Sequence, residues 1–197
     1  MMPEARKHPG AMRSARALAV QSTTMPSNVE IKARIDSVQT LLPRALALSE
    51  DEHAQLIHQD DSFFTVPHGR LKLRVFADGT GELIHYHRAD ADGPKVSDYV
   101  ISAVTEPDTL REALERACGL LGRVRKERIL VLVGHTRVHL DRVEGLGDFM
   151  ELEVVLQPGQ PEADGQAIAR ALMAKLGVPE SALVSGAYLD LLGAHKA

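Results

Sequence analysis

Residues 27–34 read SNVEIKAR, and apolar residues alternate with polar or charged ones along the stretch. Val29, Ile31 and Ala33 would share one face of an extended strand, because successive side chains of a strand point to opposite faces. An asparagine, a glutamate, a lysine and an arginine would share the other face. This charged face has two interpretations: a sheet surface in contact with solvent, or a polar interior that holds a charged ligand.

Four further stretches repeat this alternation. They are RLKLRVF (70–76), ELIHYHR (82–88), VRKERIL (124–130) and FMELEVV (149–155). Their charges are segregated by sign: bases dominate the middle stretches, whereas the acids are Glu30, Glu151 and Glu153. A solvated sheet face produces the alternation without any ligand, but such a face usually intermixes the two signs. The segregation therefore favours a polar interior.

The order of the predicted elements indicates an α+β fold with a mainly antiparallel sheet or barrel. Strand patterns cover eight stretches, residues 27–34, 55–66, 69–77, 81–90, 97–105, 123–134, 136–145 and 147–159. Helix patterns begin after Asp36 and at residues 106–122 and 160–180, and a further short helical segment is predicted in the C-terminal tail. If the amphipathic helices cover the outside of a closed sheet, the charged strand faces line a lumen.

Length and composition limit the alternatives. The 197 residues favour one domain, and the net charge of −4 gives no argument for nucleic acid or acidic membranes as partners. The single cysteine, Cys118, excludes an internal disulfide, and no apolar stretch reaches the length of a membrane span. Residues 1–26 are expected to be a disordered tail or the product of an over-extended start. Residues 27–193 are expected to form one domain of a cytoplasmic protein.

A lumen lined by about six bases implies a polyanionic ligand. Like charges at close range repel one another, so such a lumen makes sense only with an anion of matching size, and a triphosphate is the natural candidate. Glu151 and Glu153 would project side by side from one strand. Paired carboxylates of this kind would hold Mg²⁺ or Mn²⁺, which prefer oxygen ligands, against the phosphate oxygens.

A series of motifs in fixed order supports this interpretation. They are NVEIK (28–32), QDDSFF (59–64), LKLR (71–74), ELIHYHR (82–88), GPKVSDY (93–99), VRKER (124–128), HLDRVEGLGDFMELE (139–153) and AYLDLL (187–192). Together they resemble the CYTH family, the triphosphate tunnel metalloenzymes, and the last motif is similar to the tail of the class IV adenylyl cyclase branch. The resemblance covers roughly residues 28–192. It implies an eight-stranded antiparallel closed β-barrel that forms a triphosphate tunnel, with helices packed outside.

The resemblance also implies roles for individual residues. It assigns catalytic positions to Lys32, Lys126 and Arg128. It assigns substrate contacts to Lys72, Arg74, Tyr86, Arg88 and Lys95, the last from a loop that closes over the substrate. It assigns ligation of Mg²⁺ or Mn²⁺ to Glu30, Asp141, Glu151 and Glu153.

The reaction implied is that of a class IV adenylyl cyclase, which converts ATP to cyclic AMP and pyrophosphate. One alternative is a triphosphatase that hydrolyses thiamine triphosphate or inorganic tripolyphosphate. A second alternative is a non-catalytic protein that binds polyphosphate or nucleotide. An interaction protein with a merely solvated charged face is disfavoured by the retained bases and by the Glu151/Glu153 pair. The expected partner is a small-molecule triphosphate, and a homodimer is among the oligomeric states left open.

Three further features of the sequence bear on this interpretation. Asn28 stands where the family motif has its first glutamate, and it offers a carbonyl oxygen without negative charge. His85 and His87 alternate with Tyr86 and are therefore predicted on the exterior of the sheet, not in a zinc site. Asp60 and Asp61, close to Phe63 and Phe64, are consistent with either a solvated strand end or a place in the tunnel.

Overall fold

The computed structural model describes residues 28–51, 53–88 and 95–194, and the predicted N-terminal tail lies outside them. Its strands are β1 (Asn28–Arg34), β2 (Ala54–Phe64), β3 (Arg70–Phe76), β4 (Gly81–Arg88), β5 (Lys95–Val104), β6 (Leu120–Val133), β7 (Thr136–Val143) and β8 (Gly147–Val155). Its α-helices are α1 (Val38–Leu46), α2 (Pro107–Cys118), α3 (Glu162–Leu176) and α4 (Tyr188–Ala194), with a 3₁₀ turn at Glu180–Ala182. No helix in these ranges is long and apolar enough to cross a membrane.

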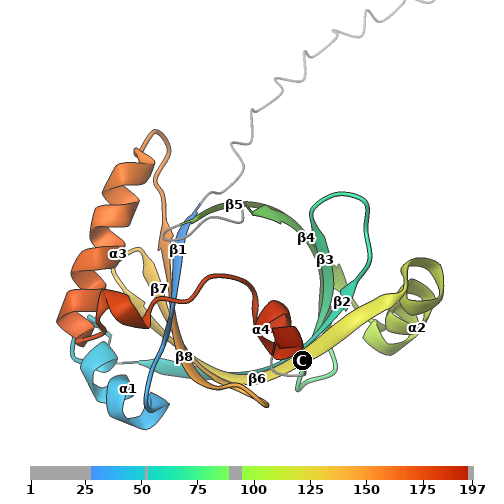
Figure 1. Ribbon diagram of the computed structural model, residues 1–197, viewed down its shortest axis with the longest axis horizontal. Coiled ribbons are helices and arrows are strands. Elements are labelled where there is room, and N and C mark those ends of the chain that lie inside the picture. Colours follow the sequence, from blue (N-terminus) through green and yellow to red (C-terminus); the bar gives the residue numbers. More distant parts are fainter. Residues whose placement is uncertain (1–27, 52, 89–94, 195–197) are drawn as a thin grey trace, which may run out of the picture.

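The strands form one curled antiparallel sheet in the order β1-β5-β4-β3-β2-β6-β7-β8 (Figure 1). β8 pairs in turn with β1 along the whole of β1, from Asn28 to Arg34. At the other side, within the described residues, β1 meets β5 at the pairs Val29↔Val96 and Glu30↔Lys95. The predicted eight-stranded antiparallel sheet of an α+β fold is therefore confirmed, as a curled sheet whose two ends meet over this short contact.

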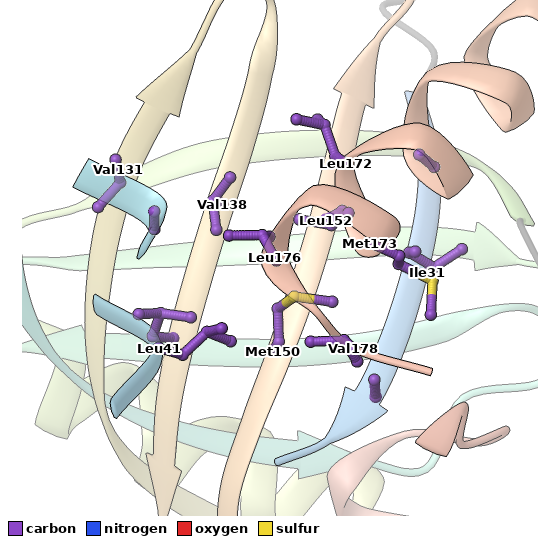
Figure 2. Close-up of a cluster of buried hydrophobic side chains, with 14 of the residues drawn as sticks. Ile31, Leu41, Val131, Val138, Met150, Leu152, Leu172, Met173, Leu176 and Val178 are labelled. Carbon is purple, nitrogen blue, oxygen red and sulfur yellow. The ribbon is translucent and has the colours of Figure 1, made fainter. Parts of the chain in front are cut away.

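The outer face of the sheet carries the larger apolar core. Ile31 from β1, Val138 from β7 and Leu152 from β8 are buried with Leu172 and Leu176 of α3 (Figure 2). α1 packs against the same part of the sheet. Full burial of each such aliphatic side chain contributes about 1.5–3 kcal/mol. Since the side chains of β1 alternate, fixing Ile31 in this core turns Glu30 and Lys32 toward the inside of the curled sheet.

The C-terminal helix α4 differs from the other three. α1, α2 and α3 lie on the outside of the sheet, as predicted (Figure 1). α4 instead packs against inward-facing apolar residues: Tyr188 contacts the ring of Phe149 edge-on, with centroids 5.0 Å apart, in a cluster with Phe63 and Val124. The prediction that the helices pack outside was wrong for α4, because the inward-facing apolar side chains are removed from water only by an element on the inner side of the sheet.

Candidate active site

The inner faces of all eight strands line one cavity of about 400 Å³. Nine of the predicted site residues line it, namely Glu30, Lys32, Lys72, Arg74, Tyr86, Lys126, Arg128, Glu151 and Glu153. Asp141 does not line the cavity, because it is fully buried behind its partners. The side chains of Arg88 and Lys95 lie outside the part of the chain that the structure describes.

One wall of the cavity carries a cluster centred on Asp141, which we call the Asp141 cluster: Lys32, Lys126, Arg128, Asp141 and Glu151. Arg128 grips Asp141 with a forked pair of hydrogen bonds, Nε to Oδ1 and Nη2 to Oδ2, both 2.6 Å. Lys126 donates to Asp141 at 3.1 Å, and Nη2 of Arg128 also donates to Glu151. Glu151 in turn pairs with Lys32 at 3.3 Å. Five ionisable side chains from four strands are therefore joined in one network.

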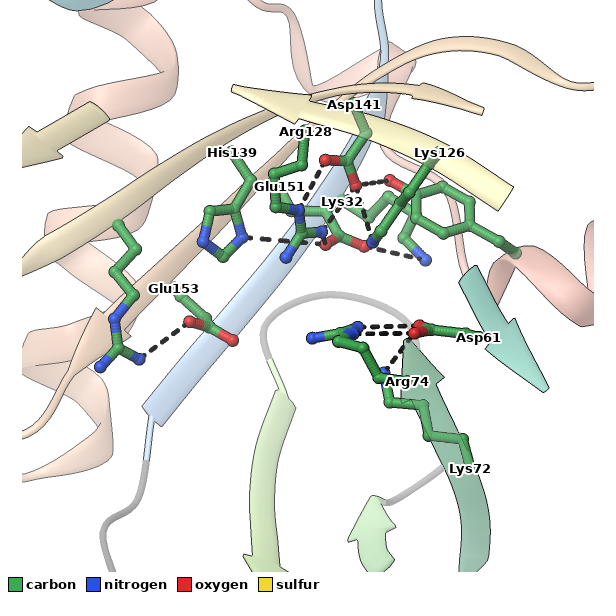
Figure 3. Close-up of polar contacts among 12 residues, drawn as sticks. Lys32, Asp61, Lys72, Arg74, Lys126, Arg128, His139, Asp141, Glu151 and Glu153 are labelled. Atoms are coloured by element: carbon green, nitrogen blue, oxygen red, sulfur yellow. Dashed lines mark hydrogen bonds and ion pairs between the residues drawn. The ribbon is translucent and has the colours of Figure 1, made fainter. Parts of the chain in front are cut away.

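The opposite wall carries a smaller cluster, which we call the Asp61 cluster: Asp61, Lys72 and Arg74 (Figure 3). Arg74 donates from Nε and Nη2 to the two oxygens of Asp61 at 2.7 and 2.8 Å, and Lys72 donates to Asp61 at 3.2 Å. Asp61 is buried and lines the cavity, which decides between the two interpretations of this residue. Its neighbour Asp60 pairs instead with Arg123.

The electrostatics of both clusters suit an anion. Each cluster contains one more base than acid. Burial alone would raise the pKa of the Asp61 carboxyl, but Lys72 and Arg74 outweigh it and hold that pKa well below its usual value. Burial, with Arg74 as a like-charged neighbour, lowers the pKa of Lys72 to about 8. Lys72 is therefore still mostly protonated at pH 7, and a bound polyanion would favour that charged form.

The carboxylates predicted to bind metal lie on neighbouring strands. Glu30 stands directly opposite Glu153 across the β1–β8 pairing, and Glu151 lies two residues further along β8. Glu153 pairs with Arg137 at 3.1 Å. In the described parts of the chain, no three His, Cys, Asp or Glu side chains are grouped closely enough to hold a metal ion by themselves.

The chemistry of these residues nevertheless fits a hard cation. The atoms near Glu30 that could bind a metal ion at the cavity are carboxylate and amide oxygens, the ligands that Mg²⁺ and Mn²⁺ prefer. Asn28 is buried at the cavity, and its Oδ1 atom has no hydrogen-bond partner. A buried carbonyl oxygen in that situation is costly unless it receives a donor or a cation. Mg²⁺ commonly uses only one or two carboxylates and completes its coordination with water and substrate phosphates, so a complete protein cage is not required.

His139 and Tyr188 are among the residues of this site that were not predicted from the sequence. His139 on β7 is buried at the cavity; its Nδ1 atom has no hydrogen-bond partner and lies 4.0 Å from Oε2 of Glu151. Burial and the nearby Arg128 lower the pKa of His139 well below its usual value, so the ring is neutral at pH 7. Tyr188 of α4 donates to Asp141 at 3.0 Å and places its ring 3.9 Å from Nζ of Lys32.

The signal for His139 was present in the sequence. It lies two residues before Asp141 in a strand pattern and therefore shares the inward face. Tyr188 lies in the AYLDLL motif, but no site role was predicted for it, because it follows the last strand and its position depends on how the C-terminal segment folds back. His85 and His87 are exposed on the outer face, and His85 contacts the carbonyl oxygen of His68, so their predicted exterior position is confirmed.

Comparisons with known proteins cover all eight strands and the cavity that they line. A family model described as the CYTH domain matches residues 27–188. Among solved structures, the PH1012 protein of Pyrococcus horikoshii OT3 is 22% identical, with a TM-score of 0.74, over 84% of this chain and 99% of its own. A Vibrio parahaemolyticus protein described as a "putative adenylate cyclase" is 20% identical, with a TM-score of 0.68, over 84% of this chain and 97% of its own. At such identities these structures show the shared fold alone. No curated protein matches the chain.

Proposed function

The chain belongs to the CYTH domain family, and on that premise we propose that it is a metal-dependent enzyme acting on a triphosphate or nucleoside triphosphate in this cavity. One observation carries the proposal. Two clusters of buried bases, each with a base in excess over its acids, face each other across one cavity. Burying this excess of one base in each cluster is unfavourable unless an anion binds there.

The bases would hold the phosphate oxygens. Arg74 and Arg128 present forked donors that match phosphate as well as carboxylate, and Lys32, Lys72 and Lys126 add compact charges. On binding, Lys32 and Arg128 would exchange Glu151 for phosphate oxygens, and the Glu151 carboxylate would become available to a cation. Charge that develops on the phosphates during reaction would then be stabilised by groups already in place.

Glu30, Glu151 and Glu153, with the carbonyl oxygen of Asn28, are the groups that we propose to hold Mg²⁺ or Mn²⁺. When bound, such an ion polarises phosphoryl oxygens and activates the attacking oxygen. Asp141, which the resemblance assigned to Mg²⁺ or Mn²⁺, is not among these proposed metal ligands. Its carboxylate accepts hydrogen bonds from Lys126, Arg128 and Tyr188 behind the cavity wall, so we propose that it positions these two bases.

The reaction that we favour is the class IV adenylyl cyclase reaction, in which the ribose 3′-hydroxyl of ATP attacks the α-phosphate and releases pyrophosphate. The AYLDLL motif supports it, since this motif is similar to the tail of the class IV cyclase branch. Its Tyr188 contacts the Asp141 cluster. Hydrolysis of thiamine triphosphate or tripolyphosphate is the alternative, because the same cavity serves it if water attacks instead. A non-catalytic triphosphate-binding protein is the second alternative, supported by the uncharged Asn28. A small-molecule triphosphate is the proposed partner, while the cytoplasmic location and the homodimer stay predictions.

One panel of assays tests the proposal. The full chain is incubated with ATP, GTP, thiamine triphosphate or tripolyphosphate and with Mg²⁺ or Mn²⁺, and cyclic nucleotide and released phosphate are both measured. We expect turnover of at least one substrate, loss of that turnover with EDTA, and a loss of about 100-fold in Glu153→Gln. Glu144→Gln, which changes an exposed glutamate, is the matched control and should leave turnover unchanged.

The outcomes separate the alternatives. Cyclic nucleotide as product supports the cyclase, and phosphate alone supports the triphosphatase. Tight triphosphate binding without turnover of any substrate would favour the non-catalytic protein. If no triphosphate binds at all, the proposed function is wrong.

A further inference from the structure

His139 on β7 is buried in the cavity wall beside the Asp141 cluster, and the proposed function gives it no role. The residue is 5% exposed, and its Nδ1 atom is buried without a hydrogen-bond partner among the described residues. Leaving such an atom unpaired costs free energy, and an apolar side chain of similar size would avoid that cost. Packing alone therefore does not explain a histidine at this position.

The register of the sheet fixes where the His139 ring lies. Val138 and Leu140, on either side of it in β7, are fully buried in the outer core, so the alternation turns His139 toward the cavity. His139 stands directly opposite Glu151 in the β7–β8 pairing. Side chains directly opposite each other on one face of an antiparallel pair are in contact range. The fold itself therefore holds the ring beside the Glu151 carboxylate.

In the structure, two bases hold Glu151 instead. Lys32 pairs with Oε1 of Glu151 at 3.3 Å, and Nη2 of Arg128 donates to Oε2. Nδ1 of His139 lies 4.0 Å from that same Oε2 atom (Figure 3), which is beyond hydrogen-bond distance. Both bases are proposed to contact phosphate, so both oxygens of Glu151 would lose these partners when a triphosphate binds. Of the polar contacts of Oε2 found in the described residues, the one with His139 then remains.

The hydrogen-bonding chemistry of a neutral imidazole suits this exchange. Such a ring has one N–H group and one acceptor nitrogen. A carboxylate oxygen beside Nδ1 favours the tautomer that carries the proton there, because a bare Nδ1 would face it as a second acceptor. A shift of about 1 Å brings Nδ1 and Oε2 to the usual N–H···O distance. A neutral donor fixes the orientation of the carboxylate and leaves its negative charge available to a cation.

We propose that His139 is a positioning residue for Glu151. When Lys32 and Arg128 turn to the phosphates, the Nδ1–H group of His139 takes the place of Arg128 at Oε2, and Oε1 is left for Mg²⁺ or Mn²⁺. The inference rests on the proposed function, since it assumes that these bases bind phosphate and that Glu151 binds the cation. It also accounts for the unpaired nitrogen, which gains its partner in the triphosphate complex.

Binding to the full chain, measured by isothermal titration calorimetry, tests the inference without relying on turnover. The probe is a methylene-bridged tripolyphosphate, which resists hydrolysis, and its affinity is measured with EDTA and with saturating Mn²⁺. The ratio of the two affinities measures the coupling between cation and phosphate. His139→Leu removes the donor and should reduce that ratio by about tenfold, as is usual when a metal ligand loses such a partner. Affinity with EDTA should stay within about twofold, because His139 does not contact the phosphates.

Two amide variants test the donor itself. Asparagine places its amide near the Nδ1 position of a histidine, whereas glutamine places it near the Nε2 position. His139→Asn should therefore keep the ratio within about twofold, and His139→Gln should reduce it as His139→Leu does. His58→Leu is the matched control. Nδ1 of His58 also lies 4.0 Å from a glutamate, Glu127, but both side chains are exposed, so the ratio should not change.

The outcomes distinguish this inference from the proposed function. If Mn²⁺ strengthens probe binding as much in His139→Leu as in the wild-type protein, the inference is overturned and the proposed function stands. The inference is also overturned if His139→Leu weakens binding equally with EDTA and with Mn²⁺, or if His139→Gln and not His139→Asn keeps the ratio. If the wild-type protein does not bind the probe, or gains no affinity from Mn²⁺, the proposed function fails and the inference fails with it.

Discussion

The Asp61 and Asp141 clusters are built from the same local pattern but differ in their surroundings. In each, a lysine and an arginine two residues apart on one strand hold an aspartate on the neighbouring strand: Lys72 and Arg74 hold Asp61, and Lys126 and Arg128 hold Asp141. Asp141 also accepts a hydrogen bond from Tyr188 of α4. The network around Asp141 continues through Glu151 to Lys32, whereas within the described residues the ion pairs of Asp61 are those with Lys72 and Arg74.

This difference indicates that the two clusters have different roles. The side chains of Lys126 and Arg128 are 5% and 8% exposed, against 15% and 13% for Lys72 and Arg74. Water can therefore reach the bases of the Asp61 cluster more easily than those of the Asp141 cluster. We infer that the Asp141 cluster is a fixed part of the fold, and that the Asp61 cluster is the more adjustable wall.

The largest difference between the clusters is expected in stability. Asp141→Asn removes the carboxylate that neutralises two buried bases, and we expect it to lower the free energy of unfolding by about 3–5 kcal/mol. Asp61→Asn should cost at least about 1 kcal/mol less, because water can partly solvate Lys72 and Arg74. Urea denaturation of both variants measures this, with Asp51→Asn, at an exposed position, as the control. Equal losses of stability for the two variants would contradict the inferred difference in role between the two clusters.

A second test uses pH. Burial holds the pKa of Lys72 at about 8, so this residue is charged below that pH and loses its charge above it. Affinity for tripolyphosphate should therefore be full at pH 7 and fall about tenfold by pH 9, measured by calorimetry. Tripolyphosphate can only become more negative as the pH rises, so a change in the ligand cannot cause this loss of affinity.

Lys72→Arg is the matched control for that measurement. An arginine keeps its charge throughout this pH range and should flatten the fall in affinity. A fall of the same size in Lys72→Arg would show that another group, and not Lys72, is responsible.

The smallest effect is expected from the hydroxyl group that α4 contributes to the Asp141 cluster. Tyr188→Phe keeps the ring over Lys32 and removes the hydrogen bond to Asp141, so it should lower the free energy of unfolding by about 1 kcal/mol. In the Asp141→Asn background the same change should cost clearly less, because the partners of the hydrogen bond are coupled. Urea denaturation of the four proteins completes the cycle, and purely additive effects would argue against the coupling.

Much of this arrangement followed from the sequence. The alternation in SNVEIKAR and in the four further strand stretches predicted which side chains face inward. A period of two allows only two choices, and the apolar core under α1 and α3 selects one of them. Glu30, Lys32, Lys72, Arg74, Lys126 and Arg128 all line the cavity for that reason. The order of the motifs also predicted the family that the chain matches.

Only the tertiary structure decided which inward side chains meet. The sequence left the position of Asp61 undecided and placed Asp141 at a metal. In the structure each aspartate is held by bases, because the pairing of β2 with β3 and of β6 with β7 places a lysine and an arginine beside each carboxylate. The contact of Tyr188 with Asp141 was likewise not predicted from any local pattern. Periodicity along one strand fixes the direction of a side chain, but its neighbours come from other strands, whose register depends on the whole sheet.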